Sequence, residues 1–375
     1  MLKTEEIENI SWFNYLKKQK KLQSYYSYLK GKTTREVFYS HIPEDILQSI
    51  IQKKISEKTL PEIFKEIDAL RAGKKIDIII GGPPCQAYST PGRVAHKRKT
   101  NWDTRKFLYK QYGEFLKRYK PKLFVFENVP GLHTSGNGVY LERMLEMFKK
   151  LGYTTEHKIL DAADFGVIQT RKRVIIIGWK KKLKFQYPDF KSIRHKYSIE
   201  DLFSDLPALK AGGKMEIVPY ADVTTEYLKK FEIRNGMRFT TEHIARPHNK
   251  KDLAIYKMAI QKWLNEGKNL SNKEIPEAKR TQSNVTSFLD RFKVVKSDSL
   301  SHTMIAHIAK DGHHYIYPDI KQLRSISVRE AARIQSFPDD YFFEDSRTAA
   351  FRQIGNAVPP LLAIRLAKKI KIILK

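Results

Sequence analysis

Two short segments of the chain hold residue types that could carry out chemistry together. Gly81–Gln86 contains Cys85, the single cysteine of the sequence, and Glu127–Gly131 begins with a carboxylate. A deprotonated thiol is a strong nucleophile, and a carboxyl group can donate or accept a proton. If the two side chains lie close together, they supply a nucleophile and an acid–base group to one substrate.

Each segment follows a short apolar run that is typical of a buried β-strand. Ile76–Ile80 precedes the first segment and Lys122–Phe126 precedes the second. Ligands of open α/β sheets bind beyond the carboxyl ends of the strands. We therefore expect Cys85 and Glu127 to face the same crevice.

Plainer interpretations of both residues stay open at this point. A lone cysteine is usually a small buried hydrophobic residue, although the two glycines and two prolines before Cys85 predict a rigid turn with exposed backbone. Glu127 by itself is more often an ordinary loop carboxylate or a partner of a helix N-terminus.

The surrounding elements are expected to alternate, which favours a parallel α/β sheet. The expected elements are, in order, a strand at Ile76–Ile80, a helix at Arg105–Tyr119, a strand at Lys122–Phe126, a helix at Tyr140–Leu151, a strand at Val174–Ile177 and two closing helices at Val328–Gln335 and Pro359–Ile373.

Three other regions have a different texture. Residues 1–75 are rich in lysine and are expected to be mostly helical, because isoleucines recur at helical spacing between Ile46 and Ile55. From about 180 to 290 the alternation disappears, and we expect a separate module there. Arg291–Tyr317 is expected to be rich in strands.

The chain is strongly basic. Its 375 residues include 70 lysines and arginines against 41 acidic residues, which gives a formal charge of +29. Such an excess favours a polyanionic partner such as nucleic acid. A chain that is simply rich in lysine is the other interpretation, and charge alone does not separate the two.

Cysteine content and apolar runs predict the cellular compartment. One cysteine allows no intrachain disulfide and no cysteine-rich metal site, so no metal is expected. The opening sequence MLKTEEIENI lacks the apolar core of a secretion signal, and the longest apolar runs are too short to span a bilayer. We expect a soluble, cytoplasmic protein.

The two chemically loaded segments together resemble the bacterial type of DNA cytosine-5 methyltransferase. Three more segments match that family in order: Gln169–Arg173 its Gln-x-Arg-x-Arg motif, Arg324–Pro338 the helix before its last motif, and Gly355–Pro360 its Gly-Asn-(Ala/Ser)-Val-Pro-Pro ending.

The resemblance implies a fold and a domain organisation. The fold is a Rossmann-like methyltransferase sheet of the α/β class, incomplete at the N-terminus, with a second, smaller target-recognition domain. Residues 1–179 would form the incomplete catalytic domain, 180–320 the target-recognition domain, and 321–375 the return to the catalytic domain.

The resemblance also implies a reaction on a flipped-out cytosine. Carbon 5 of cytosine is a poor nucleophile, and a thiolate that adds at carbon 6 turns the ring into an enamine whose carbon 5 accepts a methyl group. Cys85 would be this nucleophile. Glu127 would share a proton with ring nitrogen 3, which requires a raised pKa near the base.

Further residues receive roles by resemblance. Arg171 and Arg173 would hold the base carbonyl and a nearby phosphate and help keep the thiol ionised; a basic surface pair is the plainer interpretation. The residues expected to bind the substrate, or to order the loop that binds it, are Gln86, Ser89, Asn128 and Gln169.

The implied cofactor is S-adenosyl-L-methionine. Gly82 and Pro84 beside the nucleophile, together with Asn356, Ala357 and Val358 of the final motif, would contact it. The family's opening Phe-x-Gly-x-Gly-Gly turn and the acidic residue of its second strand are not identifiable in this sequence. A second polypeptide that supplies those strands, a truncated and inactive product, and an unfamiliar way of binding the cofactor all stay open.

The function implied is methylation of cytosine in a specific double-stranded DNA site, within a restriction-modification or similar system. An inactive DNA-binding remnant and an RNA cytosine methyltransferase are the alternatives. The long basic segment at 180–320 favours DNA.

Overall fold

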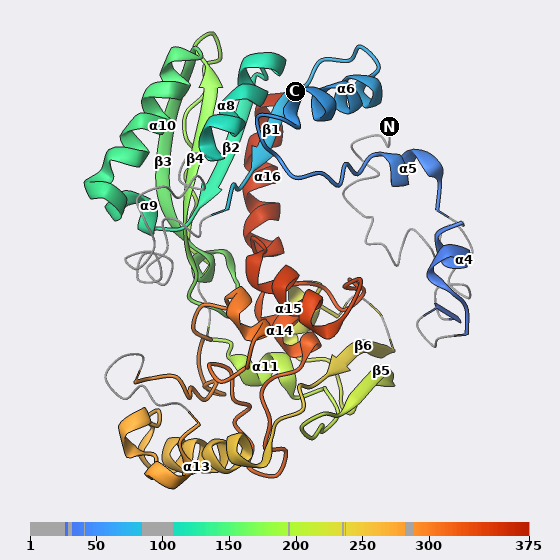
Figure 1. The fold of residues 1–375 in the computed structure, drawn as a ribbon, viewed down its shortest axis with the longest axis vertical. Helices are drawn as coiled ribbons and strands as arrows, with labels where there is room; N and C mark the ends of the chain where they lie inside the picture. The colour runs from blue at the N-terminus through green and yellow to red at the C-terminus, as the bar shows by residue number, and fades with distance from the viewer. Residues whose placement is uncertain are drawn as a thin grey trace. The chain divides into compact units, whose positions relative to one another are not determined.

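The apolar runs near Ile80 and Phe126 form neighbouring strands in the computed structural model, which describes residues 27–28, 32–40, 42–84, 108–193, 196–234, 236, 238–281 and 289–374. The strands are β1 (Ile78–Gly81), β2 (Leu123–Asn128), β3 (Tyr153–Asp161) and β4 (Lys172–Lys180), and their order in the sheet is β1-β2-β4-β3 (Figure 1). β1 and β2 are parallel, whereas β4 is antiparallel to both β2 and β3.

The expectation of a parallel sheet is therefore correct for β1 and β2 and wrong for β4, the third expected strand. Parallel neighbours need a crossover of a dozen or more residues, usually a helix. Residues 162–171 between β3 and β4 contain only the short 3-10 helix η3 (Ala162–Phe165), so the chain turns back on itself. β3 has no counterpart among the expected elements because polar residues interrupt its apolar pattern.

Two amphipathic helices pack on one apolar face of this sheet. They are α8 (Leu108–Tyr119) and α10 (Val139–Lys150), which confirms both expected helices within the described residues. In this contact the ring centroids of Phe124 and Phe148 lie 4.6 Å apart. The buried residues of the cluster are Tyr109, Tyr112, Leu116, Phe124, Phe126, Leu132, Leu141, Met144, Phe148, Tyr153, Val174 and Ile176.

The expectation of a mostly helical stretch before residue 75 is confirmed only in part. The described helices there are α4 (Arg35–Tyr39), α5 (Glu44–Gln48) and α6 (Leu60–Arg71). The isoleucine spacing does not mark one helix, because α5 ends before Ile50, which is 73% exposed. The Ser49 hydroxyl donates to the carbonyl of Ile46, a local bond that competes with helix continuation.

The chain separates into two compact units. The sheet unit comprises Ile42–Asp161, Lys172–Ser192 and Leu366–Lys375, and the second unit comprises Met1–His41, Ala162–Arg171 and Ile193–Arg365. The predicted domain boundaries at 180 and 320, and the assignment of 180–320 to target recognition, stay predictions.

Short helices and a two-stranded sheet build the second unit. Its elements include α11 (Ile199–Phe203), β5 (Lys214–Pro219), α12 (Glu226–Lys230), β6 (Phe239–Ile244), α13 (Lys250–Glu266), α14 (Val328–Ile334), α15 (Arg347–Asn356) and the start of α16 (Pro360–Leu374). β5 and β6 are antiparallel. The expected strands at 291–317 are absent from the described part of this segment, which pairs only through isolated bridges such as Val294 with Ile316.

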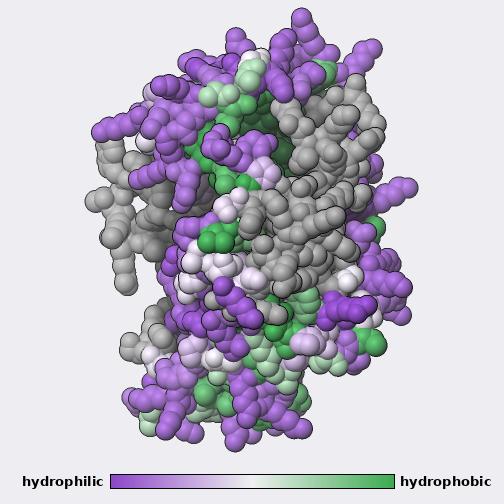
Figure 2. Space-filling model, turned by 90° about the vertical axis from the view of Figure 1, so that its right-hand side faces the viewer, coloured by the Kyte–Doolittle hydropathy of each residue, from purple (hydrophilic) through white to green (hydrophobic). Residues whose placement is uncertain are grey.

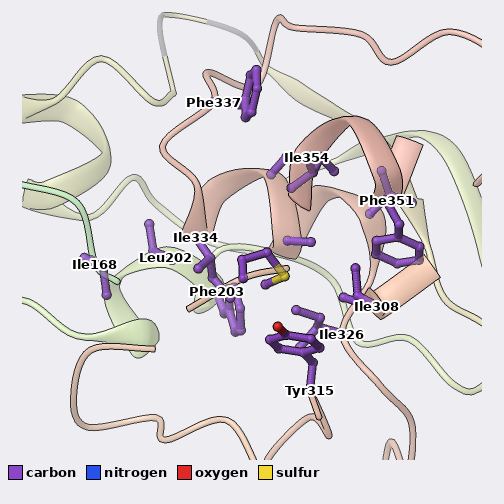
Figure 3. Packing of buried hydrophobic residues seen from close by; sticks show 14 of the residues in the cluster. Ile168, Leu202, Phe203, Ile308, Tyr315, Ile326, Ile334, Phe337, Phe351 and Ile354 are labelled. Atoms are coloured by element: carbon purple, nitrogen blue, oxygen red, sulfur yellow. The ribbon is translucent and has the colours of Figure 1, made fainter. Parts of the chain in front are cut away.

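α14 is buried along its whole length and organises the core of the second unit. Its apolar residues pack against α15, and Figure 3 shows Ile334 and Ile354 among the side chains at this contact. Its charged residues are neutralised by partners: Arg324 pairs with Glu330 at 2.7 Å, Arg329 with Glu242 at 3.3 Å and Arg333 with Asp339 at 2.6 Å. Buried charges are tolerated when paired in this way, so these partners allow α14 to lie within the core.

Candidate active site

The carboxyl ends of β1 and β2 meet at one edge of the sheet. The two strands are in register, with Gly81 opposite Phe126, and Gly82 to Pro84 continue from β1. Glu127 and Asn128 are the last two residues of β2 rather than loop residues as expected. The predicted residues Cys85, Gln86 and Ser89 lie outside the described residues; Cys85 directly follows Pro84 in the chain.

Glu127 is held by an arginine and by the shape of the β1 terminus. The Arg173 Nε lies 2.8 Å from Glu127 Oε1, and the side chains are only 11% and 21% exposed. A Cβ atom at Gly82 would lie 2.8 Å from Glu127 Oε2. Glycine at this position therefore leaves the space that the carboxylate occupies, and the ion pair orients it.

Asn128 links the two strand ends. Its side-chain amide donates to the carbonyl of Pro83 at 3.3 Å, and its side-chain oxygen accepts from the backbone N–H of Val129 at 2.9 Å. Asn128 is buried. This geometry fits the ordering role expected from the sequence, and a direct contact with substrate stays a prediction.

Arg171 and Gln169 belong to the second unit and point into it. The Arg171 guanidinium is 1% exposed and donates to the carbonyls of Met304, of Gly355 at 3.1 Å and of Ala357 at 2.9 Å. The Gln169 side chain, which is fully buried, accepts from the N–H of Met304 at 2.5 Å. The two motif arginines thus have different partners, Arg173 a carboxylate and Arg171 backbone carbonyls.

The expected cofactor residues of the final motif lie at the end of α15: Asn356 is its last residue, and Ala357 and Val358 follow it. Gly355 is required by packing, because a Cβ atom there would lie 2.3 Å from the backbone nitrogen of Ala306. Asn356 is exposed, and Ala357 and Val358 are half-buried, so all three offer surface to a ligand. Gly82 and Pro84 in the sheet unit are exposed as well.

A buried glutamine of the second unit joins Gln169 to the end of α15, and the sequence did not single it out. The Gln335 side chain accepts from Gln169 at 2.9 Å and donates to the carbonyl of Ile354 at 2.6 Å. Its position at the end of the expected helix 328–335 was the only available signal. Periodicity alone does not say which polar side chain of such a helix turns inward.

Comparison with known proteins settles the family. The family model of C-5 cytosine-specific DNA methylases matches residues 18–372. The chain belongs to this family. Its enzyme class is DNA (cytosine-5-)-methyltransferase, as predicted from the motifs.

Named relatives agree with this assignment. The chain is 45% identical over 316 residues to the type II methyltransferase M.Bpa9945I of Bacillus paralicheniformis, covering 79% of this chain and 70% of the relative. It is 30% identical over 369 residues to M.AgeI of Thalassovita gelatinovora, covering 80% and 83%. These relatives support a methylase of the restriction-modification type.

A solved structure confirms the predicted Rossmann-like methyltransferase fold. A protein encoded within an E. coli prophage, described as a DNA modification methyltransferase, matches with a TM-score of 0.60 at 22% identity and covers 86% of both chains. Within the described part of the methylase, no helix is both long and apolar enough to cross a membrane.

Proposed function

We propose that this methylase transfers a methyl group from S-adenosyl-L-methionine to carbon 5 of a flipped-out cytosine in a specific double-stranded DNA site. The observation that carries the proposal is the sheet edge where β1 leads into Cys85 and β2 ends at Glu127, beside Arg173. A nucleophile that follows one strand in the chain and an acid–base group at the end of its parallel neighbour can act on one ring.

In this mechanism the Cys85 thiolate forms a bond to carbon 6 of the base. Glu127 shares a proton with ring nitrogen 3, so the electron pair displaced from the ring double bond makes carbon 5 nucleophilic. The cofactor, when bound, supplies the methyl group to carbon 5. Loss of the carbon 5 proton to a base and departure of the thiolate then restore the aromatic ring. Arg173 keeps Glu127 aimed at the ring through its ion pair.

The residues expected at the cofactor have exposed groups of the kinds that such a ligand needs. Asn356 is exposed and polar, and the apolar residues Ala357 and Val358 that follow it are half-buried. At the end of β1, Gly82 and Pro84 expose backbone without bulky side chains. These residues would hold the amino-acid and sulfonium portions, where close approach of backbone matters.

The remaining predicted residues divide by burial. Gln86 and Ser89 follow the nucleophile in the chain and are proposed to contact the flipped nucleotide. Gln169 and Arg171 are buried among backbone groups, so we propose that they shape the site rather than contact the base. The basic segment 180–320 is proposed to read the DNA site.

Covalent trapping tests the proposed function. A duplex with 5-fluorocytosine at the target should form a stable adduct with the wild-type protein and S-adenosyl-L-methionine, because fluorine cannot leave as a proton does. Cys85→Ala should form no adduct and should transfer no labelled methyl group from S-adenosyl-L-methionine, while it still binds duplex DNA. An active wild-type protein that never forms the adduct, or an active Cys85→Ala variant, would exclude attack by this thiol.

The same assay separates the alternatives. Label transfer to a tRNA and not to duplex DNA would assign the enzyme to RNA. Duplex binding without adduct or transfer, also after co-expression with the neighbouring reading frame, would identify a DNA-binding remnant.

A second polypeptide that completes the sheet is the other candidate arrangement, and one observation favours it. Among the described strands, β1 pairs only with β2, and Ile80 of β1 is 70% exposed. An open strand edge is a template for another strand. Methyl transfer by the purified chain alone would exclude the need for a partner, whereas activity only after co-expression with a neighbouring reading frame would support it.

A further inference from the structure

We propose that Gln335 is a positioning residue for the turn at Ile354–Ala357, and through it for the cofactor. This inference rests on the proposed function, since that turn is where S-adenosyl-L-methionine is proposed to bind. Gln335 is fully buried at the C-terminal end of α14.

Both ends of the Gln335 amide are used. Its oxygen accepts from the Gln169 amide at 2.9 Å, and its nitrogen donates to the carbonyl of Ile354 at 2.6 Å and reaches the carbonyl of Ala357 at 3.5 Å. A glutamine amide bonded on both sides has one orientation. It therefore connects the 169–171 segment to the last turn of α15.

The bonds from Gln335 and Arg171 meet at the C-terminal end of α15. The last carbonyls of a helix carry partial negative charge and mostly lack an intrahelical N–H partner. The carbonyl of Ile354 accepts the backbone N–H of Ala357 at 3.2 Å and the Gln335 amide as well, while Arg171 donates to the carbonyls of Gly355 and Ala357. Gln335 thus adds a second, side-chain donor at Ile354, and the two side chains hold this helix end from the interior of the second unit.

The turn is also fixed from its other side. Gly355 packs against the backbone of Ala306 with no room for a Cβ atom, while Asn356 stays exposed. The turn is thus held by buried contacts on one side, and on the other side it is exposed where the ligand is proposed to bind. Such preorganisation lowers the cost of binding, because the protein does not have to be ordered by the ligand.

Loss of the Gln335 amide should weaken cofactor binding and leave the chemistry at Glu127 unchanged. Gln335→Met keeps the volume and removes both hydrogen bonds. Gln335→Glu keeps the bond accepted from Gln169 and removes the donation to the turn. Gln353→Leu is the matched control, because the Gln353 side chain is exposed on α15 and donates to the carbonyl of Glu344 instead.

The measurement is binding of S-adenosylhomocysteine by calorimetry, together with amide hydrogen exchange of residues 354–358. Both Gln335 variants should raise the Kd about tenfold, the loss expected for one buried hydrogen bond. They should also speed exchange in the turn. The KM for the methyl donor should rise while kcat changes little, and the Gln353→Leu control should match wild type in each assay.

The outcomes separate this inference from the proposed function. If the wild-type protein binds no S-adenosylhomocysteine, the cofactor assignment itself fails. If wild type binds and a folded Gln335→Met or Gln335→Glu variant binds equally well with unchanged exchange, Gln335 does not position the turn. Should the methionine variant fail to fold, the glutamate variant alone decides between these results.

Discussion

Two arginines separated by one residue do different work in this methylase. Arg173 lies against Glu127 at the sheet edge, whereas Arg171 is buried and donates to the carbonyls of Gly355 and Ala357. Guanidinium groups suit both tasks, because their fixed fork of donors matches a carboxylate or a cluster of carbonyls. The sequence motif presents the pair as equivalent, and their partners distinguish them.

Space at Gly82 is expected to control the position of Glu127. Gly82→Ala should lower kcat by about tenfold or more, because the new Cβ atom would meet Glu127 Oε2 and displacement of a catalytic group by about 1 Å is costly. Glu127→Gln should lower kcat by about a hundredfold through loss of proton sharing. Steady-state methyl transfer with saturating substrates measures both, and Glu146→Gln on the exposed face of α10 is the control.

A double mutant shows whether the two effects share one cause. In the Glu127→Gln background, Gly82→Ala should have little further effect, since the group that it displaces no longer works. Fully additive losses would mean that Gly82 acts on something other than Glu127.

At the scale of elements, paired strands and buried helices determine the positions of side chains that sequence patterns do not determine. β1 and β2 bring Gly82 and Glu127 together because parallel strands in register end at one edge. The elements of the second unit bury polar groups as well as charges. Burial lowers the pKa of His248 to about 3 and that of His302 to about 4.

Acid should destabilise the second unit through these histidines. Their folded pKa values lie below the ordinary value of 6.5, so the unfolded chain binds more protons and the stability that they contribute is complete above about pH 6.5. This stability should be lost as the pH falls from 6.5 toward the pKa values of the folded state. Each histidine should lower the free energy of unfolding by up to about 1.4 kcal/mol per pH unit. Urea unfolding measured between pH 7.5 and 4.5 checks this.

Glutamine substitutions identify the responsible groups. His248→Gln retains a side-chain amide where the imidazole lies 3.0 Å from the Ser325 hydroxyl, and it should flatten the dependence on pH. His302→Gln should act in the same direction. An unchanged slope in both variants would assign the acid sensitivity to other groups.

At the scale of the whole molecule, the net charge of +29 is the dominant feature. Hydrophilic side chains cover most of the described surface on the face shown in Figure 2, and hydrophobic residues are confined to separate areas. A basic surface neutralises phosphates and releases counterions from nucleic acid. The motif residues meanwhile divide between the two units, with Glu127 and Arg173 in the sheet unit and Arg171 and Asn356 in the second.

DNA binding should therefore depend strongly on salt. The logarithm of the association constant should fall with the logarithm of the salt concentration with a slope steeper than about −4, as expected for several phosphate contacts. Fluorescence anisotropy of a labelled duplex between 50 and about 300 mM salt measures this slope. A slope near zero would show that the excess charge lies away from the nucleic acid.

The sequence by itself determined the family, and it predicted the chemistry. Local strings of residues carry this information: Cys85 after its glycines and prolines, Glu127 after a β-branched run, and the ordered motifs that follow. β1, β2, α8 and α10 were also predictable, because apolar periodicity reports burial along a short segment. The roles of Glu127 and Cys85 themselves stay predictions until the trapping experiment is done.

Tertiary structure decided the direction of β4, the burial of Arg171 and the place of Gln335. The two side chains depend on partners far away in the chain: Arg171 meets Met304, Gly355 and Ala357, and Gln335 meets Gln169. A local pattern says that a side chain is polar or apolar, but the carbonyl that it reaches is set by how distant segments pack. Hydrogen bonds are short and directional, so only the folded chain determines which groups form them.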